Sequence, residues 1–300
     1  MRILLNFLLL SFAAFSVSCL SSDGISLLSL MRHWTSVPPS IKSNWSASDS
    51  TPCSWIGVTC GNNHNFVVAL NLSNCQILGQ LGPKLAQLRH LTSIDFSTND
   101  FTGSIPSELG NLQNLRVLGL FSNSLTDAIP GLLFRIPHLD TLWLNQDNLS
   151  GSIPSNVGNT SCIPPELGNC SSLTLLSAVH CGLTGPIPPS FGLLTKLEVL
   201  YFSENHLSGA IPPEIGKCKS LSDLQLYDNQ LEGEIPSQLG FLSGLKNLFL
   251  FVNRLTGEIP LSLWKIQSLK NFLAYNNNLF GELPPEITTS FLESYLKIWE

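Results

Sequence analysis

The sequence repeats itself with a 24-residue period. The segment Asn253–Pro260 reads Asn-Arg-Leu-Thr-Gly-Glu-Ile-Pro. The same frame recurs at Asn99–Pro106, Asn205–Pro212 and Asn229–Pro236, and a looser copy lies at Asn123–Pro130. A pattern of spaced leucines, Leu-x-x-Leu-x-Leu-x-x-Asn, leads into each Asn. Repeats of this length must stack on one another to bury their apolar faces, so the chain folds as an elongated array.

This period and leucine pattern define a leucine-rich repeat. They predict an α/β solenoid with a curved parallel β-sheet on its concave face and 3-10 or irregular segments on its convex side. In each unit the leucines point inward, and the Asn satisfies backbone groups of neighbouring turns. Gly permits a bend at positive φ, and Ile-Pro begins the outer segment. We call the Asn site the ladder position; its occupants are Cys75, Asn99, Asn123, Asp147, Cys181, Asn205, Asn229, Asn253 and Asn277.

The ladder positions divide residues 64–290 into about nine repeats with one break in register. Neighbouring ladder positions all keep the same spacing except Asp147 and Cys181, which are set further apart. A duplicated half-unit makes residues 155–171 irregular, either because a loop bulges there or because repeats have been lost. For residues 291–300 we favour an incomplete tenth repeat, in which Leu296 and Ile298 keep phase. The alternative is a tail that forms an amphipathic capping helix from Phe291, Leu292, Tyr295, Leu296 and Trp299.

The N-terminal residues differ from the repeats. Residues 1–20 read as a signal peptide, with Arg2, an apolar run at 3–17 and small residues after it. The run is short for a membrane span, although a retained anchor is the alternative. Residues 22–63 are expected to cap the open end of the solenoid, with a helix that begins at Ser22-Asp23 and stops at Pro38-Pro39. Cys53 and Cys60 would close a disulfide loop within this cap.

The remaining cysteines and the glycosylation motifs fit a secreted chain. Cys75 and Cys181 occupy ladder positions, and Cys170 and Cys218 share one structural column as small buried residues. Cys162 could pair with Cys170. Asn-x-Ser/Thr motifs predict glycans at Asn44, Asn71, Asn148, Asn159 and Asn169.

Composition excludes several kinds of function. The net charge of −6 argues against nucleic acid and anionic membranes as partners, and it suits a basic partner. The histidines show no metal-ligand spacing, and no phosphate-binding loop or kinase motif occurs, so we predict no metal, no cofactor and no enzymatic activity. A Glu/Asp pair could be read as a glycosidase dyad, but an open curved face offers no pocket to raise a pKa.

The residues between the inward-facing leucines lie on the concave face. Aromatic residues recur there in adjacent columns, which is typical of a binding surface rather than of scattered surface residues. Glu204 and Asp228 are neighbours in one column, where strands about 4.8 Å apart would let them share a basic side chain. The predicted ligand-binding residues are Phe121, Trp143, Tyr201, Glu204, Tyr227, Asp228, Phe249, Phe251 and Tyr275.

Two features give the sequence a family resemblance. The cap that ends in Ser-Trp-Ile-Gly-Val-Thr-Cys60, followed by Asn-x-Leu-x-Gly-x-Ile-Pro units, resembles plant leucine-rich-repeat receptor kinases. Segments 211–220 and 263–269 are similar to plant elicitor peptide receptors.

The resemblance implies an extracellular ectodomain that binds a secreted peptide on its inner surface for defence or developmental signalling. It also implies recruitment of a short leucine-rich-repeat co-receptor kinase. Such receptors are held in the plasma membrane by a membrane span and also carry a Ser/Thr kinase domain. We expect both parts only in a longer parent. The alternatives are a secreted inhibitor of cell-wall-degrading enzymes and a non-functional truncated receptor.

Overall fold

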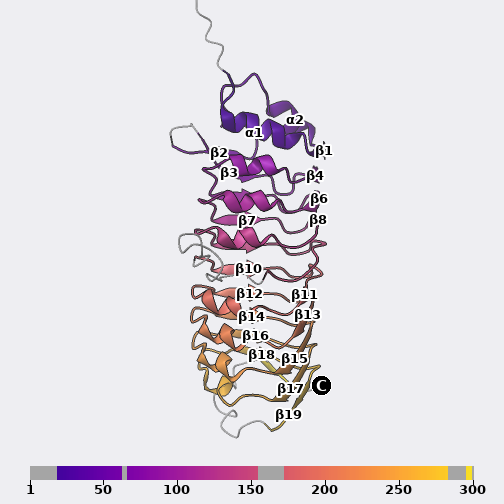
Figure 1. Ribbon diagram of the computed structural model, residues 1–300, viewed down its shortest axis with the longest axis vertical. Coiled ribbons are helices and arrows are strands. Elements are labelled where there is room, and N and C mark those ends of the chain that lie inside the picture. The colour runs from indigo at the N-terminus through magenta and orange to yellow at the C-terminus, as the bar shows by residue number, and fades with distance from the viewer. Residues whose placement is uncertain (1–18, 63–65, 155–171, 283–294, 299–300) are drawn as a thin grey trace, which may run out of the picture.

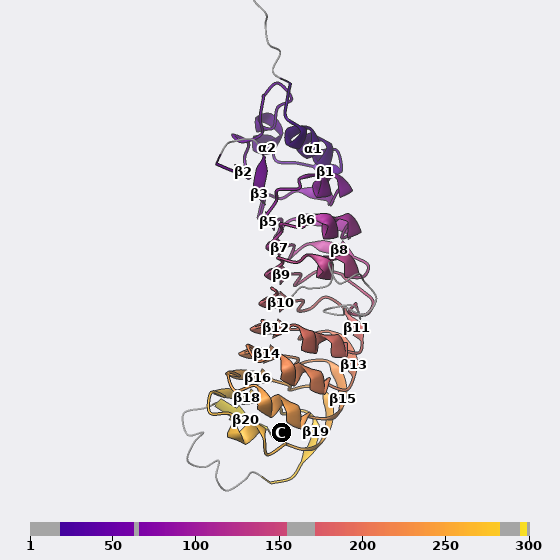
Figure 2. The same ribbon diagram turned by 60° about the vertical axis from the view of Figure 1, so that its left-hand side comes forward.

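The computed structural model describes residues 19–62, 66–154, 172–282 and 295–298. The chain forms an elongated, gently curved solenoid, with strands along one side and short helices along the other (Figure 1, Figure 2). This is the leucine-rich-repeat solenoid that the sequence period predicts, and the prediction is confirmed.

The concave face is one sheet of eleven strands in the order β2-β3-β5-β7-β9-β10-β12-β14-β16-β18-β20. All neighbouring pairs from β3 onward are parallel, and each leucine faces its equivalent one repeat away, as in Leu224 with Leu248. The strands are β2 (Val58–Cys60), β3 (Val67–Asn71), β5 (Ser93–Asp95), β7 (Val117–Gly119), β9 (Thr141–Trp143), β10 (Leu175–Ser177), β12 (Val199–Tyr201), β14 (Asp223–Gln225), β16 (Asn247–Phe249), β18 (Asn271–Leu273) and β20 (Tyr295–Lys297).

The break in register does not interrupt this sheet. Strands β9 and β10 pair directly, with Leu142 opposite Leu176, despite the longer stretch of sequence between them. The surplus residues, 155–171, fall outside the described residues, as do Cys162 and Cys170. At the other end β20 pairs with β18, with Leu296 opposite Phe272, in the phase of a tenth repeat.

A second run of strands flanks the solenoid, and the sequence analysis did not predict it. Short β-structures follow each ladder position because Leu-x-Gly segments of adjacent turns meet edge to edge. The first group contains β1 (Trp34–Ser36), β4 (Leu78–Gln80), β6 (Asp100–Ser104) and β8 (Ser124–Thr126). The second contains β11 (Thr184–Gly185), β13 (His206–Gly209), β15 (Gln230–Glu234), β17 (Arg254–Glu258) and β19 (Asn278–Phe280).

Short 3-10 helices form the convex side, as predicted. Most begin directly after a proline, such as Pro106, Pro212 or Pro236, whose fixed φ suits the start of a helix and whose missing N–H costs nothing there. The helices are η1 (Pro83–Gln87), η2 (Ser107–Asn111), η3 (Gly131–Arg135), η5 (Pro189–Leu193), η6 (Pro213–Lys217), η7 (Ser237–Phe241) and η8 (Leu263–Lys265).

The N-terminal cap contains α1 (Ser22–Met31) and α2 (Pro39–Asn44). The N-cap of α1 is Ser21, whose Oγ accepts a hydrogen bond from Gly24 N, so our predicted N-cap was one residue late. The helix also ends well before the prolines, because the chain after it leaves as β1 and pairs antiparallel with β4.

Tryptophans fill the interior of this cap. Trp45 stacks on Trp55 with ring centroids 5.3 Å apart, and Trp34 reaches Phe101 of the repeats at 6.1 Å. The predicted Cys53–Cys60 disulfide is present, with Cα atoms 5.4 Å apart. The first repeat thus has an apolar partner on its open side.

The ladder residues bond as predicted. The Nδ2 of Asn205 donates to the carbonyls of Ala178, Phe202 and Ser203, and its Oδ1 accepts from the N–H groups of Cys181 and Leu183. These bonds tie neighbouring turns together where the concave strand turns toward the flank. Among the described residues of this column, Cys181 replaces the amide with a thiol that donates to Leu144 O at 2.8 Å.

Asp147 places a carboxylate in this column. Its side chain is 5% exposed, and its Oδ1 accepts from Leu125 N at 3.0 Å. Its Oδ2 is buried with no hydrogen-bond partner among the described residues, at the place where an Asn would present its amino group. Burial raises the pKa of Asp147 to about 7, although backbone N–H groups oppose the shift.

The residue before each ladder position adopts the left-handed conformation. Its φ lies between 52° and 57° in all nine repeats, whose residues at this site are Asn74, Thr98, Ser122, Gln146, His180, Glu204, Asp228, Val252 and Asn276. We expected glycine to make the bend at positive φ. Glycines such as Gly233 (φ 79°) do so on the flank, but the turn at the end of the concave strand uses other residues.

Candidate ligand-binding surface

The concave face presents side chains from three parallel columns. Along a strand, alternate residues point to opposite faces. Leu248 and Leu250 point inward and are 0% exposed. Phe249 and Phe251 point to the concave side and are half-buried. Because the register follows the sequence period, equivalent side chains stand side by side on successive strands. The sequence alone was therefore sufficient to assign these columns.

Three of the predicted aromatic residues form one continuous stack, which we call the aromatic stack. The rings of Tyr227 and Phe251 lie 4.4 Å apart at an interplanar angle of 6°, and those of Phe251 and Tyr275 lie 4.8 Å apart at 7°. Phe249 joins it at the side, with its centroid 6.5 Å from that of Phe251. The ring spacing follows the strand spacing of the sheet. All four side chains remain partly exposed.

A carboxylate closes the N-terminal end of the aromatic stack. The Tyr227 hydroxyl donates to Glu204 Oε1 at 3.1 Å, and His180 Nδ1 lies 3.4 Å from Glu204 Oε2. Burial is the largest cause of the raised pKa of Tyr227, and the hydrogen bond to Glu204 adds to it. Asp228 directly follows Tyr227 in the chain and is exposed to solvent. Glu204 and Asp228 therefore place negative charge at one end of an apolar strip.

A second acid, Asp223, has a different role. Its carboxylate accepts hydrogen bonds from the Tyr201 hydroxyl at 3.1 Å, from Gln225 Nε2 at 3.0 Å and from Asn247 Nδ2 at 2.6 Å. Asn271 continues the chain by donating to Asn247 Oδ1 at 2.7 Å. Burial, together with the Asp223 charge, raises the pKa of Tyr201 to about 12. The three donors occupy Asp223, so it orders the concave surface.

This polar strip was missed by the sequence analysis. Asp223, Asn247 and Asn271 occupy one column, one repeat apart from each other and two positions before the column of Tyr201 and Phe249. The spacing was visible in the sequence. What it could not show is that the amides donate in one direction, toward the carboxylate.

The predicted aromatic patch is divided into two groups. Phe121 meets Trp143 edge to face at 6.3 Å. The repeat that contains β10 lies between Trp143 and Tyr201 and carries Ser177 and Val179 instead of aromatic residues.

The N-terminal end of the concave face is polar and bonded within itself. Asp95 Oδ1 accepts hydrogen bonds from the backbone N–H and hydroxyl of Ser97. In the previous repeat Asn71 Oδ1 accepts from the N–H and hydroxyl of Ser73 at 3.1 Å and 2.8 Å. Aromatic residues of the columns begin only at Phe121.

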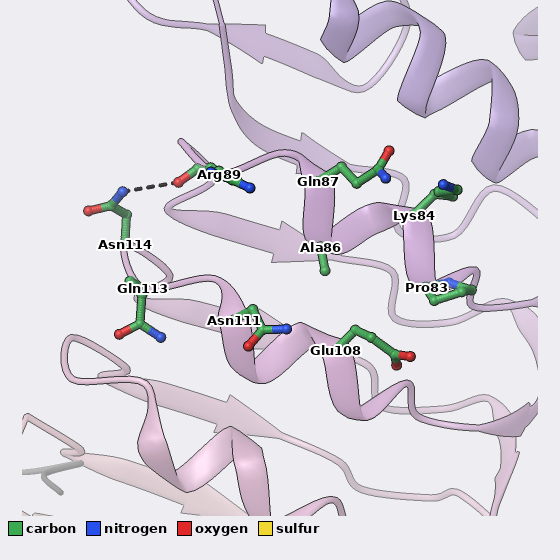
Figure 3. Close-up of a pocket in the computed structure, with 9 residues that line it drawn as sticks. All are labelled: Pro83, Lys84, Ala86, Gln87, Arg89, Glu108, Asn111, Gln113 and Asn114. Carbon is green, nitrogen blue, oxygen red and sulfur yellow. Dashed lines mark hydrogen bonds between the residues drawn. The ribbon is translucent and has the colours of Figure 1, made fainter. Parts of the chain in front are cut away.

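A hollow of the described surface lies elsewhere. It has a volume of about 650 Å³ and is a groove on the convex side between η1 and η2. Figure 3 shows its charged and amide side chains on the two neighbouring turns, with Asn114 Nδ2 donating to Arg89 O at 3.0 Å. The groove is the ordinary gap between stacked helices, and it has no concentration of aromatic groups. In the described part of the chain, no three metal-ligating side chains converge.

The predicted glycosylation sites differ in their surroundings. Asn71 and Asn148 are exposed, whereas Asn44 is half-buried and its Oδ1 accepts from Ile56 N. Asn159 and Asn169 lie outside the described residues. Within those described ranges, no helix is long and apolar enough to cross a membrane.

Comparison with known families assigns both parts of the fold. Residues 20–61 match the family described as "Leucine rich repeat N-terminal domain", and residues 90–112 and 196–218 match "Leucine Rich Repeat". A receptor-like protein kinase of Ipomoea nil is 49% identical over 90 residues, which are 30% of this chain and 8% of the relative. The Arabidopsis thaliana receptor-like protein kinase PEPR1 is 48% identical over 94 residues, again 30% of this chain and 8% of the relative.

The chain is a leucine-rich-repeat protein related to plant receptor-like kinases. This confirms the resemblance noted in the sequence, including that to the elicitor peptide receptors. The matched segments of this repeat protein span less than a tenth of those two kinases.

Solved structures of plant receptors share the fold of this repeat protein. The ectodomain of GASSHO1/SCHENGEN3 from Arabidopsis thaliana, in complex with CASPARIAN STRIP INTEGRITY FACTOR 2, is 33% identical with a TM-score of 0.71. The match covers 87% of this chain and 33% of that one. The Arabidopsis receptor kinase HAESA, in complex with the peptide hormone IDA and the co-receptor SERK1, is 32% identical with a TM-score of 0.68. That match covers 88% of this chain and 47% of the other.

Proposed function

We propose that the concave face binds a secreted peptide, as the ligand-recognition part of an extracellular plant receptor. The observation that carries the proposal is the aromatic stack, a partly exposed apolar strip on a face where every alternate side chain is already buried. Aromatic groups gathered on a surface in this way are typical of binding sites. HAESA, which shares the fold, was solved with the peptide hormone IDA, and the GASSHO1/SCHENGEN3 ectodomain was solved with CASPARIAN STRIP INTEGRITY FACTOR 2.

The chemistry of the surface favours an extended peptide with a basic residue. Apolar or flat side chains would pack on the rings of Tyr227, Phe251 and Tyr275. A Lys or Arg side chain would then reach Asp228 and Glu204, with Asp228 the more accessible of the two. Asp223 would contribute charge but is less available as an acceptor, because Tyr201, Gln225 and Asn247 already donate to it.

The partners and location follow from the same proposal. HAESA was solved with a co-receptor, and we propose that a short leucine-rich-repeat co-receptor kinase joins the peptide-bound form of this chain. The chain would act outside the cell, and at the plasma membrane as part of a longer receptor whose kinase domain signals in defence or development.

Calorimetry tests the proposal on chain secreted from a eukaryotic host. The probes are basic extended peptides with aromatic or proline residues, compared with acidic peptides of the same length. We expect binding of the basic set, and Phe251→Ala should weaken it tenfold or more, as expected for a central aromatic residue of an interface. Phe241→Ala is the matched control, because Phe241 is 61% exposed on the convex side.

Two other results would replace the proposal. A folded chain that binds none of the peptides but inhibits a polygalacturonase would assign it to the inhibitors of cell-wall-degrading enzymes. A chain that aggregates and shows no cooperative melting transition would identify a truncated, non-functional receptor. Equal losses of affinity in Phe251→Ala and Phe241→Ala would place any peptide binding away from the aromatic stack.

A further inference from the structure

We infer that a glycan on Asn71 closes the N-terminal end of the concave face, so that the ligand footprint begins at Phe121. The footprint part of this inference rests on the proposed function, whereas the glycan and the surface it covers do not.

Asn71 is at the C-terminal end of β3 and its side chain lies on the concave face. Its neighbours Leu70 and Leu72 are 1% and 0% exposed, so Asn71 points the other way, toward solvent. It stands opposite Asp95 in the parallel register of β3 and β5. A group attached to Asn71 would therefore extend over the sheet itself.

The side-chain contacts of Asn71 leave the reactive atom accessible. Its Oδ1 accepts both hydrogen bonds that Ser73 offers, from the backbone N–H at 3.1 Å and from the hydroxyl at 2.8 Å. Ser73 is the hydroxyl residue of the Asn-x-Ser motif. The Nδ2, which carries the sugar in an N-linked glycan, makes no hydrogen bond to a described residue and belongs to an exposed side chain.

The other two described motifs lie elsewhere. Asn148 is exposed but directly follows the buried ladder residue Asp147, so it belongs to the flank. Asn44 is half-buried in the cap and its Oδ1 is bonded to Ile56 N. Of the three, Asn71 alone would put a sugar on the ligand face, and Asn148 provides a matched control.

The surface beside Asn71 can be covered without loss of apolar contact area. Asp95, Ser97 and Gly119 belong to the next two repeats, and the Asp95 carboxylate accepts hydrogen bonds from Ser97. The aromatic residues of the columns begin at Phe121 and end at Tyr275, across seven strands from β7 to β18. Six strand spacings give about 29 Å, which is the length of about nine extended residues.

Two measurements test the glycan and the closure without any peptide. Chain secreted by cultured human cells is deglycosylated enzymatically in heavy-oxygen water, which converts an occupied Asn71 to labelled Asp for mass spectrometry. The thiol of Asp95→Cys is then labelled with a polymer-linked maleimide. The labelling rate of the chain without this substitution is subtracted. We expect labelling at least tenfold slower with Asn71 glycosylated than in Asn71→Gln. Asn148→Gln should leave the labelling rate at Asp95→Cys unchanged. The labelling rate at the distant Asp228→Cys site should not depend on the glycan at Asn71.

The footprint is tested with photoreactive random peptides longer than the predicted length of about nine residues. On glycosylated chain we expect cross-links between Phe121 and Tyr275 only, and cross-links that extend to Asp95 on Asn71→Gln. An unmodified Asn71, equal labelling rates at Asp95→Cys, or cross-links at Asp95 with Asn71 occupied would each overturn the inference. Occupied Asn71 and slow labelling, with no peptide bound by either form, would retain the closure and reject the proposed function.

Discussion

Replacing Asp147 by Asn should stabilise the protein, and more strongly as the pH rises. Asp147 occupies a position where Asn123, one repeat earlier, donates from Nδ2 to the carbonyls of Phe96, Leu120 and Phe121. A carboxylate has no proton to donate, and the Oδ2 of Asp147 is buried without a described partner. Asn would supply the missing N–H groups and remove the buried charge.

The sign and size of the effect follow from the pKa. Burial raises the pKa of Asp147 from 3.8 to about 7. For an acid whose pKa is raised in the folded state, the contribution of its protonated form to the free energy of unfolding is complete below the unfolded pKa near 4. It is lost as the pH rises through the folded value near 7. A shift of this size corresponds to about 4 kcal/mol across that window. Asp147→Asn should recover on the order of this amount at pH 8 and little at pH 4, by the same linkage.

Urea denaturation at several pH values between these limits measures the difference. Asp100→Asn serves as the control, because Asp100 is exposed on the flank and should give no pH-dependent gain. Equal stability of wild type and Asp147→Asn at every pH would show that the carboxylate finds a partner in solution. Greater stability of the wild type at pH 8 would refute the reasoning outright.

Four further variants test other parts of the fold, each by urea denaturation. Val252 is a β-branched residue at φ 54°, so Val252→Asn should stabilise by about 1 kcal/mol, and the reverse change Asn276→Val, at φ 53°, should destabilise by a similar amount. Asn205→Ala should lower the free energy of unfolding by about 3 kcal/mol or more, because it leaves buried N–H and carbonyl groups of two turns without hydrogen-bond partners. A decrease below about 1 kcal/mol would contradict the role of the ladder residue. Replacing both Cys53 and Cys60 by Ser should cost about 2 to 3 kcal/mol, since the bridge closes a short loop, and a neutral result would show that the tryptophans alone hold the cap.

Periodicity made most of the solenoid predictable. A constant interval fixes which side chains are equivalent, and parallel pairing places equivalents side by side, so Leu224 faces Leu248 without further information. The ladder bonds of Asn205 and the disulfide of Cys53 with Cys60 follow from similarly local patterns. The flank strands did not, because such short segments carry too little alternation to distinguish strand from turn.

The candidate site was predicted as columns but not as contacts. Sequence spacing placed Tyr227, Phe251 and Tyr275 together, and the rings do stack. It gave no reason to expect that Asp223 would accept hydrogen bonds from three side chains while Asp228 stays exposed. Such differences depend on side-chain direction within one column, which an interval of residues does not encode.

The left-handed turn before each ladder position also limits how the ligand face can change over time. A side chain at that site must tolerate positive φ, which favours Asn, Asp or Gly and penalises branched residues such as Val252. The neighbouring column, which holds Tyr227 and Phe251, lies two positions before the ladder position and carries no such restriction. Substitution can therefore vary the exposed members of that column, such as Tyr227 and Phe251, without a backbone penalty, whereas a branched side chain at the rim beside it carries one. A surface built this way can acquire new ligands largely by exchanging one row of residues per turn.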